Sequence, residues 1–348
     1  MSLARWSVVL VALVLVAAAC GDSDSPDDTQ TATSEAEDSG SSSAPATTAA
    51  EPVATTEAAT EADGAYPRTV SHVQGETEIP EPPSRIVAAT SFAELDTLLG
   101  LGVEVAVRGS YGEELARSKV DAGAGELEVW EISWPPSVEA VAELEPDIVF
   151  VSFGDGNAAE FYDPVAAVAP TFVLPAGDLE EQVRIVAEAL NLPQERVDGA
   201  LADVNASLDS FAPARTPESV MMIDYYCGES VWFWVPESGP GRTLNRLGLS
   251  LTELEGGEPG AEAFEISLEN LDLLDADLLL MSTYSEAEAN LEEGCVVDLY
   301  ENPAFQALPV FQEGNVAVLT PEEGRSLDTS SILNVETFVR GMERALAG

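Results

Sequence analysis

Residues 137–152 read SVEAVAELEPDIVFVS, and residues 267–282 read SLENLDLLDADLLLMS. The two stretches align without a gap and are identical at five positions. Each copy begins with Ser and has Glu two residues later, as short helices often do. An acidic turn follows, and then an uninterrupted apolar run. Such a run predicts a strand that is buried on both faces, inside a parallel sheet covered by helices. The repeat therefore predicts the same α/β unit in each half of the chain. The identical pairs are Ser137/Ser267, Glu139/Glu269, Leu144/Leu274, Asp147/Asp277 and Ser152/Ser282.

The segments around each copy predict two α/β lobes, one over residues 66–177 and one over residues 214–348. Each lobe begins with a buried strand and alternates helices with further apolar strands, which is the order of a parallel β-α-β arrangement. The first lobe has strand 85–90, helix 92–102 and strands 103–109 and 171–175; the second has strand 219–226, helix 241–249, strand 315–320 and a final helix 331–346.

The segment between the lobes, residues 178–213, has almost no strand pattern. Apolar residues recur in it at helical spacing, and Pro193 suits a first helical turn. A helix from Pro193 to Phe211 is roughly 28 Å long at about 1.5 Å per residue, which is enough to join two lobes. The predicted fold class is therefore two Rossmann-like α/β lobes joined by a single long α-helix, with a ligand cleft between the lobes. The apolar stripe consists of Val197, Leu201, Val204, Leu208 and Phe211.

The first 19 residues have the features of a secretory signal: Arg5, then an apolar run that is short for a membrane span, then small residues. The end of this run resembles a bacterial lipobox, with Ala17 where Leu is commonest and Cys20 at the cleavage point. Lipidation of Cys20 is therefore expected; an uncleaved anchor and an ordinary signal peptide are the alternatives, and each exports the chain. Residues 20–65 are rich in Ser, Thr, Ala, Pro and acids, which predicts a disordered tether.

The charge of the chain is strongly negative. It carries 63 acidic and 14 basic residues, and only eleven of the acids lie in the tether. The folded part therefore repels nucleic acid and anionic lipid surfaces, which removes those classes of partner. Solubility or adaptation to high salt is a simpler explanation of the excess than a specific cationic partner.

Two further cysteines, Cys227 and Cys295, remain as a pair when Cys20 is lipidated. Exported proteins reach compartments in which disulfides form and persist. We therefore expect a Cys227–Cys295 disulfide, and two separate buried thiols are the alternative.

Three segments, in this order, resemble the ferric-siderophore-binding proteins of ABC importers, a helix-linked bilobal group that also contains haem and cobalamin binders. The segments are TVSHVQGETEIPEPPSRIVAAT (69–90), SVEAVAELEPDIVFVS (137–152) and ENPAFQALPVFQEGNVAVLT (301–320). The resemblance covers nearly all of the folded chain. It implies a monomeric, membrane-tethered binding protein that captures an iron(III)-siderophore outside the cytoplasm and delivers it to the permease dimer and ATPase of an ABC importer.

Residues that follow the predicted strands are the candidates for ligand contact, because open α/β sheets bind ligands beyond the carboxyl ends of their strands. Four of the five tryptophans fall in predicted loops of this kind, where flat rings suit a bulky chelate and arginines suit its oxygens. Some of these aromatic residues are equally expected in the lobe cores. The ligand-binding candidates are Arg108, Tyr111, Trp130, Trp134, Phe153, Tyr225, Tyr226, Trp232, Trp234 and Arg325.

Direct metal capture and catalysis are both disfavoured by the sequence. Transition-metal sites need clusters of His, Cys or carboxylate ligands, and the chain has one histidine, His72, in the first predicted strand. Iron is therefore expected inside a chelator, with no cofactor held by the protein. The sequence contains no Gly-x-Ser-x-Gly motif, phosphate loop or Cys/His pair, so an enzyme is not expected.

The resemblance also implies one acidic residue near the tip of each lobe that pairs with arginines of the permease. Glu160 follows the first copy of the repeat, and Glu288 follows the second, with Glu286 as an alternative. Surplus surface charge explains these acids equally well.

The identity of the ligand stays open. The lack of a spare histidine weakens haem, although Tyr225 or Tyr226 offers an iron ligand; a corrinoid, or a surface sensor on the same fold, is a further alternative. The anionic body favours neutral or cationic ferric hydroxamates over trianionic catecholates, unless Arg108, Arg242 and Arg325 supply local positive charge.

Overall fold

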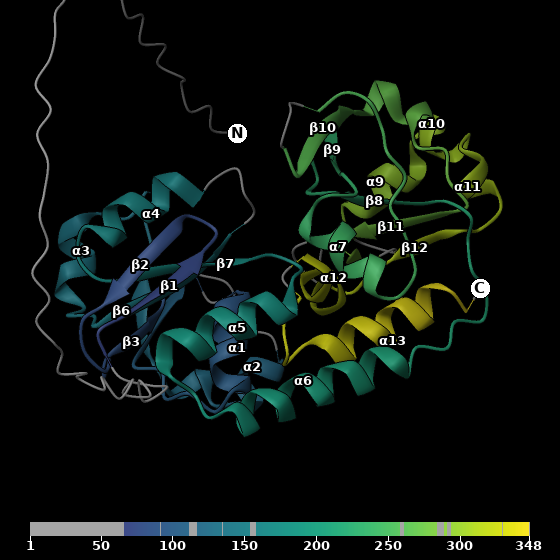
Figure 1. The fold of residues 1–348 in the computed structure, drawn as a ribbon. Helices are drawn as coiled ribbons and strands as arrows, with labels where there is room; N and C mark the ends of the chain where they lie inside the picture. Colours follow the sequence, from purple (N-terminus) through teal and green to yellow (C-terminus); the bar gives the residue numbers. More distant parts are fainter. Residues whose placement is uncertain are drawn as a thin grey trace, which may run out of the picture. The chain divides into compact units, whose positions relative to one another are not determined.

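The computed structural model of the protein describes residues 66–90, 92–110, 117–133, 135–153, 158–257, 261–283, 289–290, 294–328 and 330–347. Strands in these ranges form two five-stranded sheets and a separate hairpin of β1 (Arg68–His72) and β2 (Gly75–Ile79) (Figure 1). No helix within the described ranges is both long and apolar enough to cross a membrane.

The N-terminal sheet has the strand order β5-β4-β3-β6-β7, and every adjacent pair is parallel. Residues of α1 and α5 share an apolar core with one face of this sheet, and residues of α3 and α4 share a core with the other face. The elements are β3 (Ile86–Ala88), α1 (Ala93–Gly100), β4 (Val107–Ser110), α2 (Arg117–Asp121), η1 (Ala124–Glu126), β5 (Glu128–Glu131), α3 (Val138–Glu143), β6 (Ile148–Phe153), α4 (Ala158–Ala166), β7 (Thr171–Pro175) and α5 (Leu179–Leu190).

The C-terminal sheet has the order β10-β9-β8-β11-β12, in which β8, β11 and β12 are parallel and β9 and β10 are antiparallel. Helices α7, α12 and α13 share a core with one face, and α9, α10 and α11 share a core with the other. Two α/β lobes are therefore confirmed. The elements are β8 (Val220–Asp224), β9 (Ser230–Trp234), α7 (Gly239–Arg246), β10 (Ala263–Ser267), η2 (Leu268–Leu273), β11 (Leu278–Ser282), α9 (Val296–Glu301), α10 (Pro303–Gln306), α11 (Pro309–Gln312), β12 (Val316–Val318), α12 (Pro321–Asp328) and α13 (Val335–Ala345).

The repeated aspartate joins two adjacent strands at the start of each parallel core. In the N-terminal lobe, Asp147 Oδ2 accepts hydrogen bonds from Ser84 N (2.8 Å), Ser84 Oγ (2.6 Å) and Arg85 N (2.8 Å), immediately before β3. In the C-terminal lobe, Asp277 Oδ2 accepts from the two backbone N–H groups just before β8, at 2.9 and 3.0 Å. The side chain that opens the repeated strand therefore also fixes where the neighbouring strand begins.

The repeated serines start the short helices of both copies. Ser137 Oγ accepts a hydrogen bond from Ala140 N before α3, and Ser267 Oγ accepts from Glu269 N before η2. The helix prediction holds for the first copy, whereas the second copy forms a 3-10 helix with non-helical dihedrals at Asn270. A hydroxyl at the N-cap satisfies a backbone donor that the helix leaves unpaired, so the two serines have the same structural role.

Helix α6 (Gln194–Asp209) contributes to the cores of both lobes. Val197 belongs to the N-terminal core, whereas Val204 and Leu208, further along the same stripe, belong to the C-terminal core. Figure 1 shows α13 running beside α6, and the two helices are in contact. The helix expected from the apolar stripe is present and joins the lobes.

A buried polar cluster makes a second connection between the lobes. The ammonium of Lys119, the only lysine in the chain, pairs with Asp96 Oδ1 at 2.9 Å. From the C-terminal lobe, Ser331 Oγ donates to Asp96 Oδ2 at 2.7 Å, and Asn334 Nδ2 lies 3.5 Å from the same oxygen. The buried Asp96 carboxylate is therefore paired with Lys119 in its own lobe and hydrogen-bonded by Ser331 of the other, which links the two lobes.

The expected disulfide is present between Cys227 and Cys295, whose Cα atoms are 5.3 Å apart. It ties the connection between β8 and β9 to the start of α9. Cys227 has a φ of 61°, a left-handed conformation that is uncommon for a residue other than glycine.

Replacing Asp147 with Ala is expected to lower the free energy of unfolding by about 1–2 kcal/mol, because three donors before β3 lose their acceptor. These hydrogen bonds lower the pKa of Asp147. Since the folded-state pKa is the lower one, the contribution is present at neutral pH and is lost as the pH falls through it. Urea unfolding at pH 7 and at low pH measures both effects.

The matched control is Glu143→Ala, which removes an exposed carboxylate from the same stretch. A loss of stability as large as that of Asp147→Ala would show that charge, rather than the strand contact, is responsible.

Candidate functional site

The carboxyl end of β7 lies against the C-terminal lobe. Just after β7, Ala176 O accepts a hydrogen bond from Arg242 Nε of α7 at 2.9 Å. At the next residue, Gly177 (φ +71°), a Cβ would come within 2.4 Å of Gly239 O, so only glycine fits there. Gln182 Nε2 donates both to Pro175 O, at the end of β7, and to Ser330 O of the other lobe. The end of β7 and the start of α5 therefore lie against the C-terminal lobe.

Asp224 is a buried carboxyl group at the carboxyl end of β8. Tyr226 Oη donates to its Oδ2 at 2.6 Å, and Ser282 Oγ, at the end of β11, donates to its Oδ1 at 2.8 Å. Burial raises the pKa of Asp224, and the donated hydrogen bonds act in the opposite direction. The last serine of the second repeat thus orients this carboxyl group.

Two tryptophans of β9 lie on the same face as Asp224. The strand is antiparallel to β8, and Trp232 is paired in register with Asp224, so it lies at the carboxyl edge with 39% of its surface exposed. Trp234 is half-buried deeper in the sheet. Its indole N–H lies near enough to the Asp224 carboxyl to lower the pKa, although it does not reach hydrogen-bond geometry. The exposed ring of Trp232 is therefore available to a ligand.

The corresponding edge of the N-terminal lobe has a similar arrangement. Ser152, the last serine of the first repeat, donates its N–H to Thr90 Oγ1 at 3.4 Å, and Thr90 Oγ1 lies 3.3 Å from Ser152 O. Glu94 Oε1 accepts from Thr90 N at 2.7 Å. Glu94 is fully buried, which raises its pKa, while the bonds from Thr90 and the nearby Lys119 charge lower it. Each lobe therefore has a buried carboxyl group beside the end of its first parallel strand.

Three aromatic candidates lie in strands rather than in the predicted loops. Trp130, in β5, is only 8% exposed and its ring centroid lies 6.3 Å from that of Phe161 in the lobe core. Trp232 and Trp234 lie in β9. Tyr225 is 2% exposed and belongs to the C-terminal core. The loop prediction is wrong for these tryptophans, and the alternative of core packing applies to Trp130 and Tyr225.

The arginine candidates have protein partners. Arg108 Nε donates to Ala124 O of η1 at 3.0 Å. Arg325 is half-buried in α12, directly after Gly324, which lies against Ser282.

For two further candidates the structure describes the backbone element only. Phe153 ends β6 and Glu160 lies in α4, but their side chains are outside the described part of the chain. The remaining candidates fall outside the described residues altogether: Cys20, Tyr111, Trp134, Glu286 and Glu288.

Four residues of these clusters were missed from the sequence: Glu94, Asp96, Lys119 and Asp224. One signal was available for Asp224, because it ends an otherwise apolar strand, VMMID. Lys119 was recognisable only as the single lysine of an arginine-poor chain. Nothing in the local sequence indicates that two carboxylates of α1 are buried.

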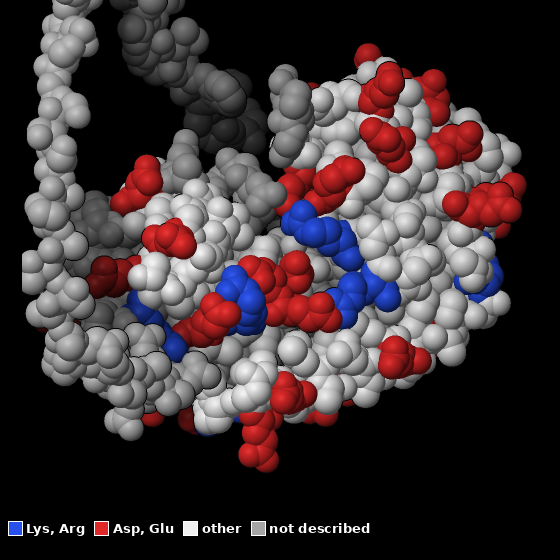
Figure 2. All heavy atoms as spheres, viewed as in Figure 1, with Lys and Arg blue, Asp and Glu red and all other residues white. Residues whose placement is uncertain are grey.

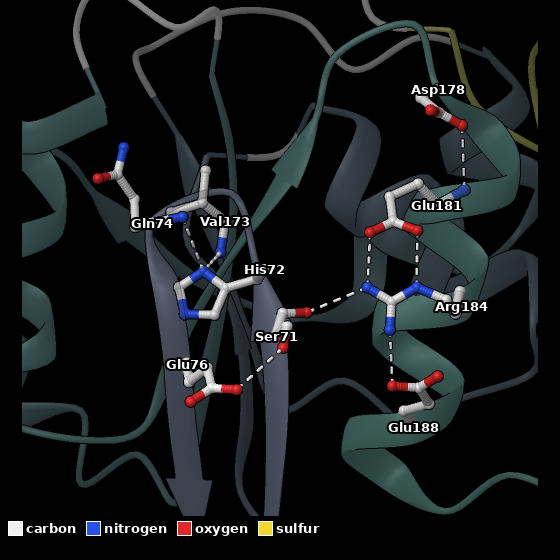
Figure 3. Close-up of polar contacts among 9 residues, drawn as sticks. All are labelled: Ser71, His72, Gln74, Glu76, Val173, Asp178, Glu181, Arg184 and Glu188. Atoms are coloured by element: carbon white, nitrogen blue, oxygen red, sulfur yellow. Dashed lines mark hydrogen bonds and ion pairs between the residues drawn. The ribbon is translucent and has the colours of Figure 1, made fainter.

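His72, the chain's one histidine, has a structural role (Figure 3). Its Nδ1 accepts the backbone N–H groups of Gln74 and Val173, both at 3.3 Å, and its Nε2 lies 2.9 Å from Thr77 Oγ1. Desolvation lowers the pKa of His72 to about 4. The neutral ring joins the β1–β2 hairpin to β7, and the described residues contain no cluster of metal-ligating side chains.

Two grooves lie away from the strand ends. One, of about 470 Å³, is lined by Tyr66, Ile86 and Arg196 at the amino end of β3. The other, of about 540 Å³, lies between α6 and α13, where Arg340 pairs with Glu336. Neither combines the carboxyl ends of parallel strands with an exposed aromatic ring, so the strand-end region remains the candidate site.

The structure predicts a specific pH dependence for His72→Asn, which keeps an acceptor but does not titrate. Below the unfolded-state pKa of about 6.5, His72 of the unfolded wild type takes up a proton. The ring of the folded protein stays neutral until the pH falls to about 4. The wild type therefore loses stability, on the order of 3 kcal/mol, between these values, and the variant does not. Denaturant unfolding from pH 7 to pH 4.5 should show the two stabilities converging; a constant difference would contradict this role.

Two α/β lobes, joined by α6 and in contact beside the end of β7, define a bilobal binding-protein fold. The family model described as "periplasmic binding protein" matches residues 87–323, and the chain belongs to this family.

Relatives and solved structures agree with that assignment. The probable siderophore-binding lipoprotein YfiY of Bacillus subtilis is 28% identical over 264 residues, which cover 71% of this chain and 78% of the relative. The ferric enterobactin-binding periplasmic protein FepB of Escherichia coli is 26% identical over 296 residues, covering 78% and 89%. The crystal structure of Staphylococcus aureus SirA complexed with staphyloferrin B has a TM-score of 0.65 at 16% identity, over 80% of this chain and 98% of that one, which supports the fold.

Proposed function

We propose that the protein captures an iron(III)-siderophore outside the cytoplasmic membrane and delivers it to an ABC importer, without catalysing a reaction. The observation that carries the proposal is the exposed ring of Trp232 beside Asp224 at the carboxyl edge of the C-terminal sheet, in a two-lobed fold in which the end of β7 lies against the other lobe. Family membership and the siderophore-binding names of YfiY and FepB support the same class of ligand. Iron enters as part of the ligand, so no protein-held metal is required.

Binding is proposed to depend on a largely preformed site. Helix α6 contributes to both cores, and the Asp96–Lys119 pair is bonded to Ser331 of the other lobe. These connections restrict the relative motion of the lobes, so less ordering free energy is spent when the ligand binds. Aromatic rings contribute large contact areas at a low entropic cost, and Trp232 is proposed as the main one among the described residues.

Delivery is proposed to depend on the membrane anchor at Cys20 and on acidic docking residues, Glu160 in α4 and Glu288. Acidic groups on both lobes suit a permease with paired basic surfaces and speed the encounter electrostatically. The lipidated chain is expected to act as a monomer at the outer side of the membrane.

Titration of the purified protein with ferric siderophores should change the tryptophan fluorescence with dissociation constants below about 10 micromolar. Trp232→Leu is expected to weaken binding at least tenfold, because it removes the exposed ring while leaving an apolar residue in β9. Arg340→Gln, an exposed change on α13, is the matched control and should bind normally. If ferric hydroxamates, catecholates and citrate all fail to bind while haem or cobalamin binds, the proposal is wrong.

Uptake of radioactive ferric siderophore by cells that express the protein with its importer tests delivery. Cys20→Ala and the pair Glu160→Ala and Glu288→Ala should each reduce uptake several-fold without changing the ligand affinity of the purified protein. The double variant Glu139→Ala and Glu143→Ala, at two exposed positions of α3, serves as the charge-matched control. Undiminished uptake in the Glu160/Glu288 double variant would rule out these docking residues.

A further inference from the structure

The connection between β8 and β9, residues 225–229, joins the two residues on which the candidate site depends. Asp224 ends β8, and Trp232 of β9 is paired with it in register, so both belong to one hairpin. Tyr226, within the connection, donates its hydroxyl to Asp224 Oδ2 at 2.6 Å. The path of the backbone through this connection therefore decides whether the Tyr226 ring reaches the carboxyl group.

Cys227 has an uncommon backbone conformation at the middle of the connection. Its φ of 61° lies in the left-handed region, where the Cβ of an L-residue crowds the following carbonyl oxygen. Apart from glycine, asparagine and aspartate adopt this region most readily, and cysteine has no such preference. A conformation of this kind persists only where the surrounding structure holds it. Its loss would turn the chain in another direction next to Tyr226.

The disulfide supplies a restraint at this residue. It joins Cys227 to Cys295, which is the N-cap residue of α9. Val296 and Leu299 of α9 are buried in the core of the C-terminal lobe, so the helix is fixed by packing. Cys227 itself is exposed. The cross-link therefore ties an exposed residue of unfavourable conformation to a helix that the core holds in place.

Hydrogen bonds hold the two ends of the same connection. At its start, Tyr225 N donates to Ser282 O at 3.0 Å, and at its end Glu229 O accepts from Leu268 N at 3.1 Å. The covalent bond acts between these two points, at Cys227.

Charge does not draw the connection towards α9. The connection has one charged side chain, Glu229, and Asp298 of α9 is also acidic. Burial, and next the charge of Asp298, raises the pKa of Tyr225, which places α9 close to the connection. Figure 2 shows acidic side chains spread widely over the face in view, with fewer basic ones. In a chain so poor in basic residues, a disulfide is a restraint that needs no cation.

We propose that the disulfide positions the ligand site by holding Cys227 in its left-handed conformation. That conformation keeps Tyr226 on Asp224, beside the exposed ring of Trp232. The inference rests on the proposed function and adds that the cross-link acts on ligand affinity as well as on stability.

The test removes the cross-link and varies the residue at position 227 of the full-length chain. Cys295→Ser is combined either with Cys227→Asn or with Cys227→Val. Asparagine enters the left-handed region readily, whereas the branched side chain of valine is a severe misfit there. The probes are ferrioxamine B, ferric enterobactin and ferric citrate, and each variant is titrated with those that bind the wild type. We expect the Asn variant to bind within about threefold of the wild type and the Val variant about tenfold more weakly.

The matched control is Asn191→Val, at the C-cap of α5. Asn191 also has a left-handed backbone, with a φ of 50°, and it lines the groove at the amino end of β3, away from the candidate site. This variant should lose stability but keep the wild-type affinity. Urea unfolding shows that every variant is folded under the conditions of the titration. A loss of affinity in Asn191→Val as large as that in the Cys227→Val variant would overturn the inference, because destabilisation alone would then explain both.

Hydrogen exchange of the ligand-free protein reports the same positioning. The N–H groups of Tyr225 and Leu268, which bond to Ser282 O and Glu229 O, should exchange faster in the Cys227→Val variant than in the Cys227→Asn variant.

Equal affinities of the Asn and Val variants, whether as tight as the wild type or equally weak, would overturn the inference while leaving siderophore binding intact. Failure of all three ferric complexes to bind the wild type would instead reject the proposed function. The exchange rates would then decide the positioning by themselves, and equal rates in the two variants would overturn it.

Discussion

The structure depends on the aspartate that the chain uses twice. Asp147 and Asp277 each open a central parallel strand and accept hydrogen bonds from the backbone just before the neighbouring strand, at Ser84 and Ser219 respectively. The parallel registers that begin at Ile86/Ile148 and Val220/Leu278 then bring Thr90 beside Ser152 and Asp224 beside Ser282. The positions of Thr90, Ser152, Asp224 and Ser282 at common edges follow from this constraint, and those edges carry the candidate site.

The relative position of the lobes depends on a different set of contacts. Helix α6 provides an apolar connection, and the Asp96–Lys119 pair with Ser331 provides a buried polar one. The desolvation of two buried charges is costly, so this ion pair is not by itself a source of large added stability. Arg242 adds a third connection, from α7 to Ala176 O beside the end of β7.

Much of the fold was predictable because it depends on local patterns. The continuous apolar runs of the repeat gave the buried strands, and the stripe from Val197 to Leu208 gave α6. Less of the site was predictable. A tryptophan suits a core and a ligand surface equally, and only the folded chain separates Trp232, which is 39% exposed, from Trp130, which is 8% exposed. The partners of Arg242 lie 66 residues away at Ala176 and 20 away at Glu262, and no local sequence signal specifies such contacts.

The central claim, that the ligand binds between the facing strand ends, is tested most directly by crystals of the protein grown with a ferric hydroxamate. An anomalous difference map at the iron absorption edge locates the metal without assumptions about the chelator. The account predicts one strong peak between the carboxyl edges of the two sheets, with the chelate in contact with Trp232. A peak instead in the groove lined by Tyr66 and Arg196, at the amino end of β3, would contradict it.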